Sequence, residues 1–353
     1  MSKHEALLSD FTAGRKAALA RAISIVENHR VGFDDLLAAL HPKLGRARRI
    51  GVTGPPGARK SPLTTALTRA YRAQGLTVGI VAVDPTSPFT GGALLGDRIR
   101  MEEVALDPGV FIRSLATRGS LGGLSAATRE TCDVLDAFGI DRILIETVGV
   151  GQSELDVART SDTTLVVLVP ESGDSIQTLK AGLMEIADVF TVNTADRPGA
   201  DRLRNEIEVM LGMRTGAMTQ HSAGHHGVDL LQNNIRKQVR AAAAHDSARW
   251  TPTVLRTTAV KGEGIDEVVD ALDRHFRYLE ESGTLRARRR TRLRDRVIEV
   301  VEAKTRRRLW TDAATNAWLD ERLADMESGA TTPFAIADDL LGRSADLLTR
   351  TST

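Results

Sequence analysis

Short runs of β-branched and aliphatic residues alternate with longer stretches of helical apolar spacing from about residue 46 to residue 279. This alternation is typical of a parallel sheet whose strands are joined by crossover helices. The candidate strands are residues 50–53, 78–83, 110–115, 142–148, 164–169, 189–192 and 254–258. The pattern therefore predicts an α/β fold with a doubly wound, mostly parallel sheet.

Helical patterns continue on both sides of this domain. Leu7 and Phe11 begin a series of apolar positions at near-helical spacing, and after the domain the strand signal stops. We predict a helical N-terminal extension at 1–45, the α/β domain at 46–279 and a helical C-terminal arm at 280–353. The arm cannot bury its bulky apolar side chains alone, and its spacing leaves open whether it packs on its own α/β domain or on a second copy.

The overall charge of the chain is close to neutral. With 47 basic and 46 acidic residues, bulk electrostatics do not steer the protein toward nucleic acid. One segment is rich in arginine: Arg286, Arg288, Arg289, Arg290, Arg292, Arg294 and Arg296. Because no aromatic residues interleave there, a solvated helix face is favoured over a nucleic-acid patch, and we expect no nucleic-acid partner.

Composition favours a cytoplasmic protein with a sizeable core. The hydrophobic fraction is 42%, and Cys132 is the single cysteine, which fits a reducing compartment and excludes a disulfide framework within one chain. The longest apolar stretch, residues 165–169, is too short to cross a membrane. The first residues lack the apolar core of a signal peptide, so we expect neither export nor membrane association.

The most informative motif is a glycine-rich run, Gly-Val-Thr-Gly-Pro-Pro-Gly-Ala-Arg-Lys-Ser, at residues 51–61. In a phosphate-binding P-loop, backbone N–H groups cradle phosphate, a lysine neutralises the outer phosphates and a hydroxyl holds Mg²⁺. Arg59 stands where the strict pattern has glycine. The candidate phosphate-binding residues are Gly54, Pro55, Pro56, Gly57, Ala58, Arg59, Lys60, Ser61 and Pro62.

Three carboxylates follow at positions where α/β sheets bind ligands. Asp84 and Glu146 lie at strand ends, and Asp97 ends a glycine-rich loop. Such carboxylates can hold a metal ion and its water. Gly149 is placed to contact a γ-phosphate, and Gln152 could orient water. Turn capping for Asp84 and a solvated loop position for Gln152 remain alternatives.

The last two strands end in candidate base-binding segments. Residues 193–196 read Asn-Thr-Ala-Asp, with the spacing of a guanine-reading Asn-Lys-x-Asp motif. Asp196 could accept hydrogen bonds from guanine N–H groups that adenine does not present. Ala259 and Val260 follow the last strand, where a backbone N–H would meet the guanine oxygen. Together these motifs predict a nucleotide-binding protein.

With these residues the chain resembles, over its whole length, the MeaB and ArgK group of SIMIBI-class P-loop GTPases. The most specific segments are residues 82–88, 90–97, 146–152 and 173–177. The resemblance implies binding of GTP and GDP with Mg²⁺. It also implies a GTP-hydrolysing chaperone that gates cofactor loading and protects an adenosylcobalamin-dependent methylmalonyl-CoA mutase. A homodimer held by the C-terminal helices is implied as well.

The resemblance also assigns roles to single residues. It implies phosphate and metal contacts by Lys60 and Ser61, and base contacts by Asn193 and Asp196. The implied metal-side residues are Ser61, Asp84, Asp97 and Glu146. The implied catalytic residues are Lys60, Asp97, Glu146 and Gln152. Gln177 and Lys180 lie in a segment that resembles a mobile switch signalling to the mutase.

Three departures from the family pattern fall on nucleotide contacts. Arg59 adds a side chain where backbone must approach phosphate and where the backbone angle can disfavour arginine. Pro62 removes an N–H and biases Ser61 away from helical backbone, although proline is tolerated in a first helical turn. Thr194 replaces a lysine whose stem packs on guanine. We therefore expect weakened nucleotide binding.

Other functions stay open at this stage. A pseudo-GTPase would keep the dimer and the docking surface without turnover. A metal-inserting GTPase could use His221, His225 and His226, although the Cys-rich relay expected of such proteins cannot be built from Cys132. A small-molecule kinase is disfavoured by Asn193 and Asp196. Cys132 lies in a helical pattern and is interpreted as a buried thiol.

Overall fold

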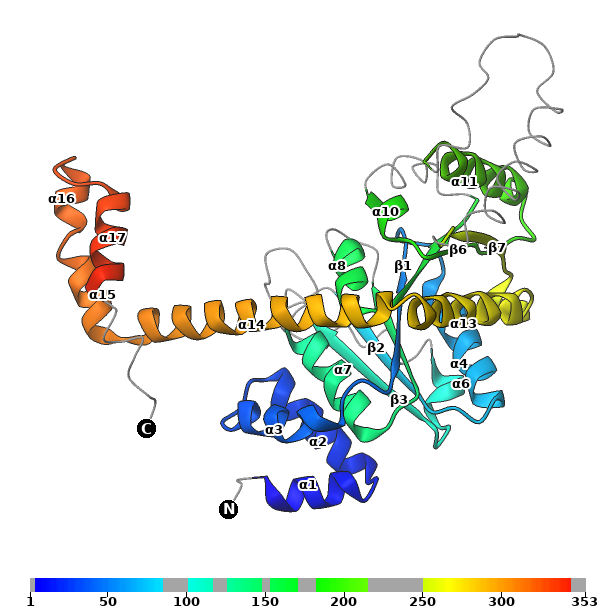
Figure 1. The fold of residues 1–353 in the computed structure, drawn as a ribbon, viewed down its shortest axis with the longest axis horizontal. Coiled ribbons are helices and arrows are strands. Elements are labelled where there is room, and N and C mark those ends of the chain that lie inside the picture. The colour runs from blue at the N-terminus through cyan, green and yellow to red at the C-terminus, as the bar shows by residue number, and fades with distance from the viewer. Residues whose placement is uncertain are drawn as a thin grey trace, which may run out of the picture. The chain divides into compact units, whose positions relative to one another are not determined.

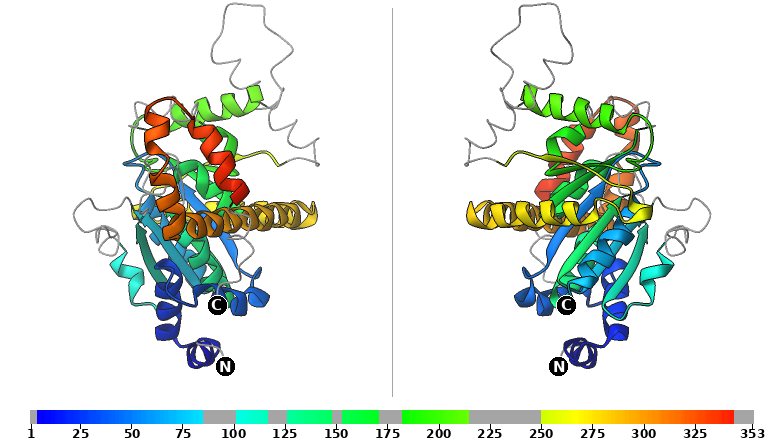
Figure 2. Two further views of the ribbon diagram at one scale, coloured as in Figure 1. Left: turned by 90° about the vertical axis from the view of Figure 1, so that its left-hand side faces the viewer. Right: turned by 90° about the vertical axis from the view of Figure 1, so that its right-hand side faces the viewer.

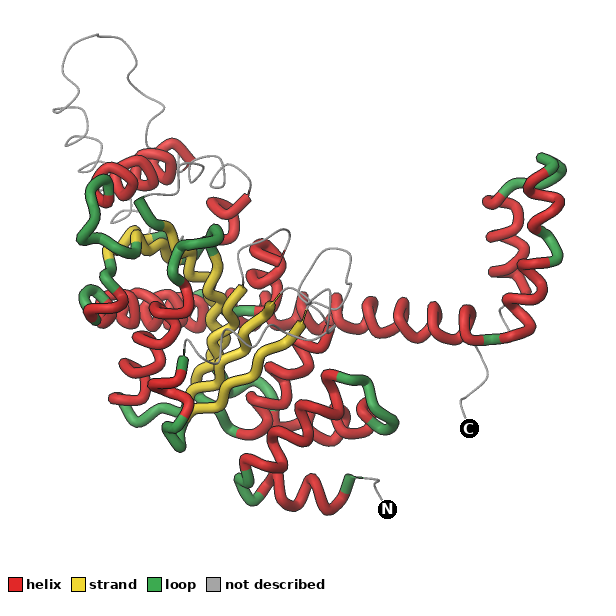
Figure 3. The backbone as a smooth tube through the Cα atoms, turned by 180° about the vertical axis from the view of Figure 1, so that it is seen from behind, coloured by secondary structure: helices red, strands yellow, loops and turns green. Residues whose placement is uncertain are grey.

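The computed structural model describes residues 4–84, 101–116, 126–147, 153–170, 182–214 and 250–343. The chain forms two compact units, Met1–Leu285 and Arg286–Thr353. A seven-stranded sheet of order β3-β2-β4-β1-β5-β6-β7 lies at the centre of the first unit, and every neighbouring pair is parallel. The predicted doubly wound α/β fold is therefore confirmed (Figures 1 and 3).

The predicted strands lie within two residues of the observed ones. The strands are β1 Arg48–Thr53, β2 Val78–Asp84, β3 Val110–Ala116, β4 Arg142–Thr147, β5 Thr163–Leu168, β6 Val189–Val192 and β7 Thr253–Arg256. The central ones, such as β5 with every residue buried, read as continuous apolar or β-branched runs because helices cover both faces. That burial made them recognisable in the sequence.

Helices cover both faces of the sheet. The longer ones in the first unit are α4 Lys60–Ala73, α7 Ala126–Phe138, α8 Ser153–Thr160, α11 Ala200–Arg214 and α13 Ile265–Glu281. Shorter ones are α6 Glu102–Ala105, α10 Met184–Ile186 and the 3₁₀ turn η3 Ala259–Lys261. Figure 1 shows α7 and α8 on one side of the sheet and α4 and α13 on the other. Strand residues alternate accordingly, with Ile80 in the core under α4 and Val81 in the core under α7.

The N-terminal extension is helical, as predicted. It consists of α1 Glu5–Thr12, α2 Lys16–Glu27, α3 Phe33–Leu40 and the 3₁₀ turn η1 His41–Lys43. These helices lie at the opposite end of the unit from α11 (Figure 2). They share a core with α7, where the Phe11 and Phe138 rings meet edge to face at 5.0 Å.

A buried carboxylate fixes the chain where the extension enters the sheet. Asp136 on α7 accepts hydrogen bonds from the backbone N–H groups of Gly45, Arg46 and Ala47, at 2.9, 3.0 and 2.9 Å. The Arg49 guanidinium lies 3.2 Å from the same carboxylate. Because β1 begins at Arg48, directly after Ala47, Asp136 sets the direction of the strand that delivers the glycine-rich loop.

The second unit is helical, which confirms the predicted helices at the C-terminal end. Its elements are the Arg286–Thr311 part of α14 Thr284–Thr311, then α15 Ala313–Asp320, α16 Leu323–Glu327 and α17 Pro333–Arg343. Its buried apolar side chains among the described residues are Leu309, Ile336 and Leu340. The exposed large apolar side chains are Leu293, Val297, Ile298, Val301, Trp310, Leu323, Phe334 and Leu341. Across the described residues of both units, no helix is long and apolar enough to cross a membrane.

Candidate nucleotide-binding site

The glycine-rich loop connects β1 to α4 at the carboxyl edge of the sheet. Gly54 has φ 142° and Gly57 has φ 79°, both in the region that favours glycine. A Cβ on Gly54 would overlap the carbonyl oxygen of Val167 on β5, so any side chain there would displace a central strand. The loop can pass this close to the sheet only because residue 54 is glycine.

Arg59 occupies the position before α4 with left-handed backbone, at φ 57° and ψ 46°. The missing glycine at position 59 had already indicated a backbone angle that disfavours arginine, and the structure confirms a positive φ there. For an L-residue other than glycine this conformation costs about 1–2 kcal/mol. The substitution therefore strains the loop while leaving its path intact.

We expect Arg59→Gly to stabilise the protein. Removing the Cβ relieves the left-handed strain, and part of the gain is lost to the greater freedom of glycine in the unfolded chain, leaving about 1 kcal/mol. Urea unfolding measures the difference. Arg59→Ala is the matched control, because it removes the guanidinium but keeps the Cβ; an equal gain in Arg59→Ala would assign the cost to charge rather than to backbone.

The bias of Ser61 away from helical backbone, expected from Pro62, is not realised, and the expected tolerance of proline in the first helical turn is confirmed. Ser61 and Pro62 are the second and third residues of α4, which runs unbroken from Lys60 to Ala73. N–H groups in the first helical turn lack acceptors within the helix, so a proline there removes no helical hydrogen bond. Packing of the buried face of α4, including Leu63 and Leu67, keeps the helix start in place.

Lys60 points its ammonium into the loop. Its Nζ donates hydrogen bonds to the carbonyl oxygens of Gly54 at 2.8 Å and Pro55 at 3.1 Å. The residue is only 6% exposed. A buried cation is thus held at the centre of the glycine-rich turn by backbone oxygens.

Ser61 and Glu146 lie together, as the sequence predicted from motifs 85 residues apart. The Ser61 hydroxyl donates to Oε1 of Glu146 at 2.6 Å, and both residues are buried. Their meeting follows from the sheet, since β1 and β4 are neighbours with Val52 paired to Glu146. A hydroxyl and a carboxylate in contact form the kind of oxygen set that Mg²⁺ prefers.

Of the remaining predicted metal-side and switch residues, Asp84 is the last residue of a described range, and the others lie outside the described ranges. Asp84 is the last residue of β2, and β2 pairs with β4 so that Ala82 lies opposite Glu146. Its backbone therefore reaches the same edge as Glu146. The predicted residues outside the described ranges are Asp97, Gly149, Gln152, Gln177, Lys180, His221, His225 and His226.

Among the residues that are described, no cluster of three or more metal-ligating side chains occurs. Cys132 is buried on α7, which confirms its interpretation as a core thiol.

Asn193 connects the glycine-rich loop to the segment after β7. Its Nδ2 donates to the carbonyl oxygens of Ala58 and Arg59, each at 3.3 Å. Its Oδ1 accepts from the Thr257 hydroxyl and the Ala259 N–H, each at 3.2 Å. With 1% exposure, Asn193 holds two loops in register, a positioning role that the sequence motif alone did not reveal.

Thr194 also has left-handed backbone, at φ 55°. This is a strained position for a β-branched residue. Its hydroxyl donates to the Asn193 carbonyl oxygen at 2.6 Å, and the side chain is buried. Thr194 therefore folds back on its own turn, unlike the long lysine of the guanine-reading motif.

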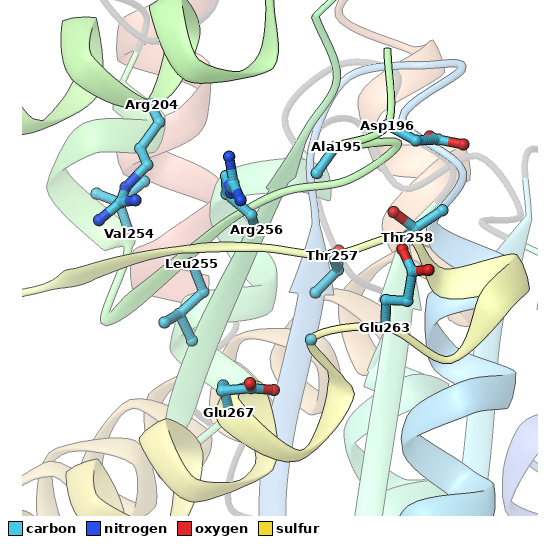
Figure 4. A pocket seen from close by; sticks show the side chains of 11 residues that line it. Ala195, Asp196, Arg204, Val254, Leu255, Arg256, Thr257, Thr258, Glu263 and Glu267 are labelled. Atoms are coloured by element: carbon cyan, nitrogen blue, oxygen red, sulfur yellow. The ribbon is translucent and has the colours of Figure 1, made fainter.

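Asp196 lies at one end of a hollow beside β7. The hollow has a volume of about 410 Å³ and is lined by Ala195, Asp196, Arg204, Val254, Leu255, Arg256, Thr257, Thr258, Glu263, Gly264 and Glu267. Figure 4 shows the Asp196 carboxylate pointing away from Leu255 and Glu267. The Lys261 ammonium lies 2.9 Å from Oδ2 of Asp196. A hydrogen bond from Lys261 lowers the pKa of the Asp196 carboxyl, so the carboxylate stays ionised.

The pairing of Asp196 with Lys261 was not predicted. The two residues lie in turns that follow different strands, β6 and β7, and their distance depends on how those turns fold. One signal was present in the sequence, because both strands were predicted to end at the same edge of the sheet. The direction of either side chain had no signal in the sequence.

A glycine-rich turn with a buried lysine, opening the helix after the central strand of a parallel sheet, defines the P-loop nucleotide-binding class. The sequence profile of the methylmalonyl-CoA mutase-associated GTPase MeaB matches residues 19–314. The chain belongs to this family of P-loop GTPases, which are hydrolases that bind guanine nucleotide.

The similarity of individual proteins to this chain is consistent with this family. A Pyrococcus horikoshii relative is 44% identical over 301 residues, covering 85% of this chain and 86% of its own. The mouse mitochondrial methylmalonic aciduria type A homolog is 30% identical over 359 residues, covering 97% and 78%. A crystal structure of a LAO/AO transport system kinase is similar over 95% of each chain, with TM-score 0.63 and 25% identity.

Proposed function

We propose that this protein binds GTP and GDP with Mg²⁺ at the loop of residues 54–61 and hydrolyses GTP. The observation that carries the proposal is the buried Ser61–Glu146 contact, made by the residue next to Lys60, whose ammonium lies in the loop. Lys60 offers a cation for phosphate, and Ser61 with Glu146 offers a hydroxyl and a carboxylate for a metal ion. The loop that carries them begins at Gly54, where there is no room for a Cβ. These residues fit a magnesium nucleotide.

Each described residue has a role in this proposal. Lys60 would bind the outer phosphates, and Ser61 with Glu146 would hold Mg²⁺, which when bound neutralises phosphate charge. Asp196 would accept the guanine N1–H and 2-amino group. The amides of Ala259 and Lys261 already donate to Asn193 and Thr258, which favours the Val260 N–H as donor to the guanine oxygen. By family resemblance we add Asp84 and Asp97 on the metal side, Gly149 at the γ-phosphate and Gln152 at the attacking water.

The three departures from the family pattern act by different routes, and two of them are expected to weaken nucleotide binding. Arg59 adopts its left-handed angle within the protein's own fold, so we place its cost on the stability of the loop rather than on affinity. Pro62 lacks the N–H that another residue would offer at the start of α4. Thr194 lacks the long lysine side chain that packs on guanine in the family pattern. Each of the latter two is expected to cost about 1–3 kcal/mol of binding. The exposed Arg59 guanidinium offsets part of this loss because it can pair with phosphate.

Calorimetry with GDP, GTP and ATP in the presence of Mg²⁺ tests the nucleotide part of the proposal. We expect binding of GDP and GTP at least about 100-fold tighter than ATP, since adenine lacks the donors that Asp196 reads. Asp196→Asn is the matched control: its amide fits the xanthine 2-oxygen, so the variant should prefer XDP to GDP. Equal binding of ATP and GTP would point to the small-molecule kinase instead.

A second candidate, a binding module without turnover, is favoured by the two strained positions Arg59 and Thr194. Phosphate release from GTP, measured at saturating nucleotide, separates the two. Tight GDP binding with no phosphate release, alone or with a mutase, would support the module and contradict the enzyme.

We further propose that the partner is an adenosylcobalamin-dependent mutase of the methylmalonyl-CoA type, whose cofactor loading this GTPase gates and which it protects. The family's name and the mouse relative's name support this. We also propose a homodimer through residues 280–353, supported by the exposed apolar side chains of α14–α17. Light scattering with and without purified mutase tests both: a monomer contradicts the dimer, and no complex contradicts the partner.

A further inference from the structure

The ion pair between Asp196 and Lys261 joins the turn after β6 to the turn after β7. The Lys261 ammonium is 2.9 Å from Oδ2 of Asp196. Both side chains are partly open, with 39% of Asp196 and 52% of Lys261 exposed. A solute can therefore reach the carboxylate while the pair is formed.

The turn that carries Lys261 is anchored at several points. The Lys261 N–H donates to the Thr258 carbonyl oxygen at 2.8 Å, and the Thr258 N–H donates to Glu263 at 3.1 Å. Gly264, at φ 74°, closes the turn where a Cβ would overlap the Arg256 carbonyl oxygen. The backbone of Lys261 is thus fixed against the end of β7.

The turn that carries Asp196 is anchored to the same strand end. The Ala195 N–H donates to the Thr257 carbonyl oxygen at 3.0 Å, and the Arg197 N–H donates to Thr194 at 3.0 Å. Within residues 193–196 the sequence is Asn-Thr-Ala-Asp, which contains no basic side chain. The cation that meets Asp196 therefore comes from the neighbouring turn.

We propose that Lys261 is a positioning residue for guanine recognition, whose ammonium holds the Asp196 carboxylate in the orientation that accepts the guanine N1–H and 2-amino group. An open aspartate samples several rotamers, and an ion pair with a cation carried on an anchored backbone reduces that freedom before the base arrives. A carboxylate offers about four acceptor positions, so one bond to Lys261 leaves room for both guanine donors. This inference rests on the proposed guanine-nucleotide site.

The test compares GDP with IDP, which lacks the 2-amino group, by calorimetry. Lys261→Met keeps the side-chain stem and removes the ammonium, Lys261→Arg restores a cation, and Lys43→Met is a control at an exposed lysine of η1. We expect Lys261→Met to weaken GDP binding about fivefold, the upper range for an exposed pair, and IDP binding less. The GDP-to-IDP preference should fall accordingly and return in Lys261→Arg.

The outcomes separate this inference from the function on which it rests. An unchanged GDP-to-IDP ratio in Lys261→Met, or tighter GDP binding, overturns the positioning role while the guanine site stands. A wild type that binds no guanine nucleotide, or binds ATP equally well, overturns the proposed function and the inference with it. Parallel losses for GDP and IDP in Lys261→Met would show a general structural effect and also overturn the positioning role.

Discussion

Lys60→Met is expected to lower the affinity for GDP by about 100-fold, two decades at about 1.4 kcal/mol each. The ammonium is buried at the centre of the glycine-rich loop, where Gly54 and Pro55 carbonyl oxygens aim it. Hydrogen bonds from a buried cation to phosphate gain strength because water does not compete. Methionine fills the same volume without charge. Titration of a fluorescent GDP analogue measures the loss.

Two controls make this result interpretable. Lys43→Met removes an exposed lysine whose Nζ donates to the Thr12 hydroxyl, so it should leave nucleotide affinity unchanged. A thermal melt of Lys60→Met shows whether the loop still folds. An unchanged GDP affinity in a folded Lys60→Met protein would place the phosphates elsewhere and contradict the site.

The sheet was predictable because its physical requirements are local. The buried strands are continuous apolar runs, and each ends where polar or glycine residues begin, as at Thr53 before Gly54. Motif spacing then placed Ser61 and Glu146 at one edge, because carboxyl ends of parallel strands meet there. The order of strands and helices and the placing of Ser61 and Glu146 at one edge both follow once the strands are assigned.

Side-chain partners across different turns were not predictable. Asn193 was assigned to the base, yet its amide ties Ala58 to Ala259. Lys261 had no assigned role, yet it meets Asp196. These contacts depend on how three turns pack, which no single stretch of sequence encodes. Only the bias that Pro62 was expected to place on Ser61 is not realised, because packing of the rest of α4 outweighs the local backbone preference at Ser61.

The structure also shows where the irregular backbone of the site is stabilised. The left-handed residues Arg59 and Thr194 both lie next to Asn193, which bonds to the Arg59 carbonyl oxygen and accepts the Thr194 hydroxyl on its own carbonyl. Strained residues persist where surrounding contacts over-determine them. Asn193 supplies those contacts from the turn that follows β6, so the irregular backbone of the loop is supported from the edge of the sheet.

The largest effect on stability is expected at Asp136, far from the nucleotide edge. Asp136→Ala should lower the free energy of unfolding by about 3–5 kcal/mol, because it leaves three buried or half-buried backbone N–H groups without this acceptor and removes one partner of a half-buried cation. The three are those of Gly45, Arg46 and Ala47. The cation is Arg49: burial lowers its pKa, and the nearby negative charges, Asp133 first and Asp136 among the others, raise the pKa overall.

Asp133→Ala is the matched control, since Asp133 also meets Arg49, at 2.8 Å, but accepts none of those three N–H groups and is 29% exposed. We expect it to cost about 1 kcal/mol, as for a partly exposed pair. Urea unfolding followed by circular dichroism compares the two variants. Equal losses of unfolding free energy in the two variants would mean that the ion pair with Arg49 carries the effect. A much larger loss in Asp136→Ala would show that the hydrogen bonds to residues 45–47 stabilise the fold. These hydrogen bonds set the direction of β1 and therefore the position of the glycine-rich loop.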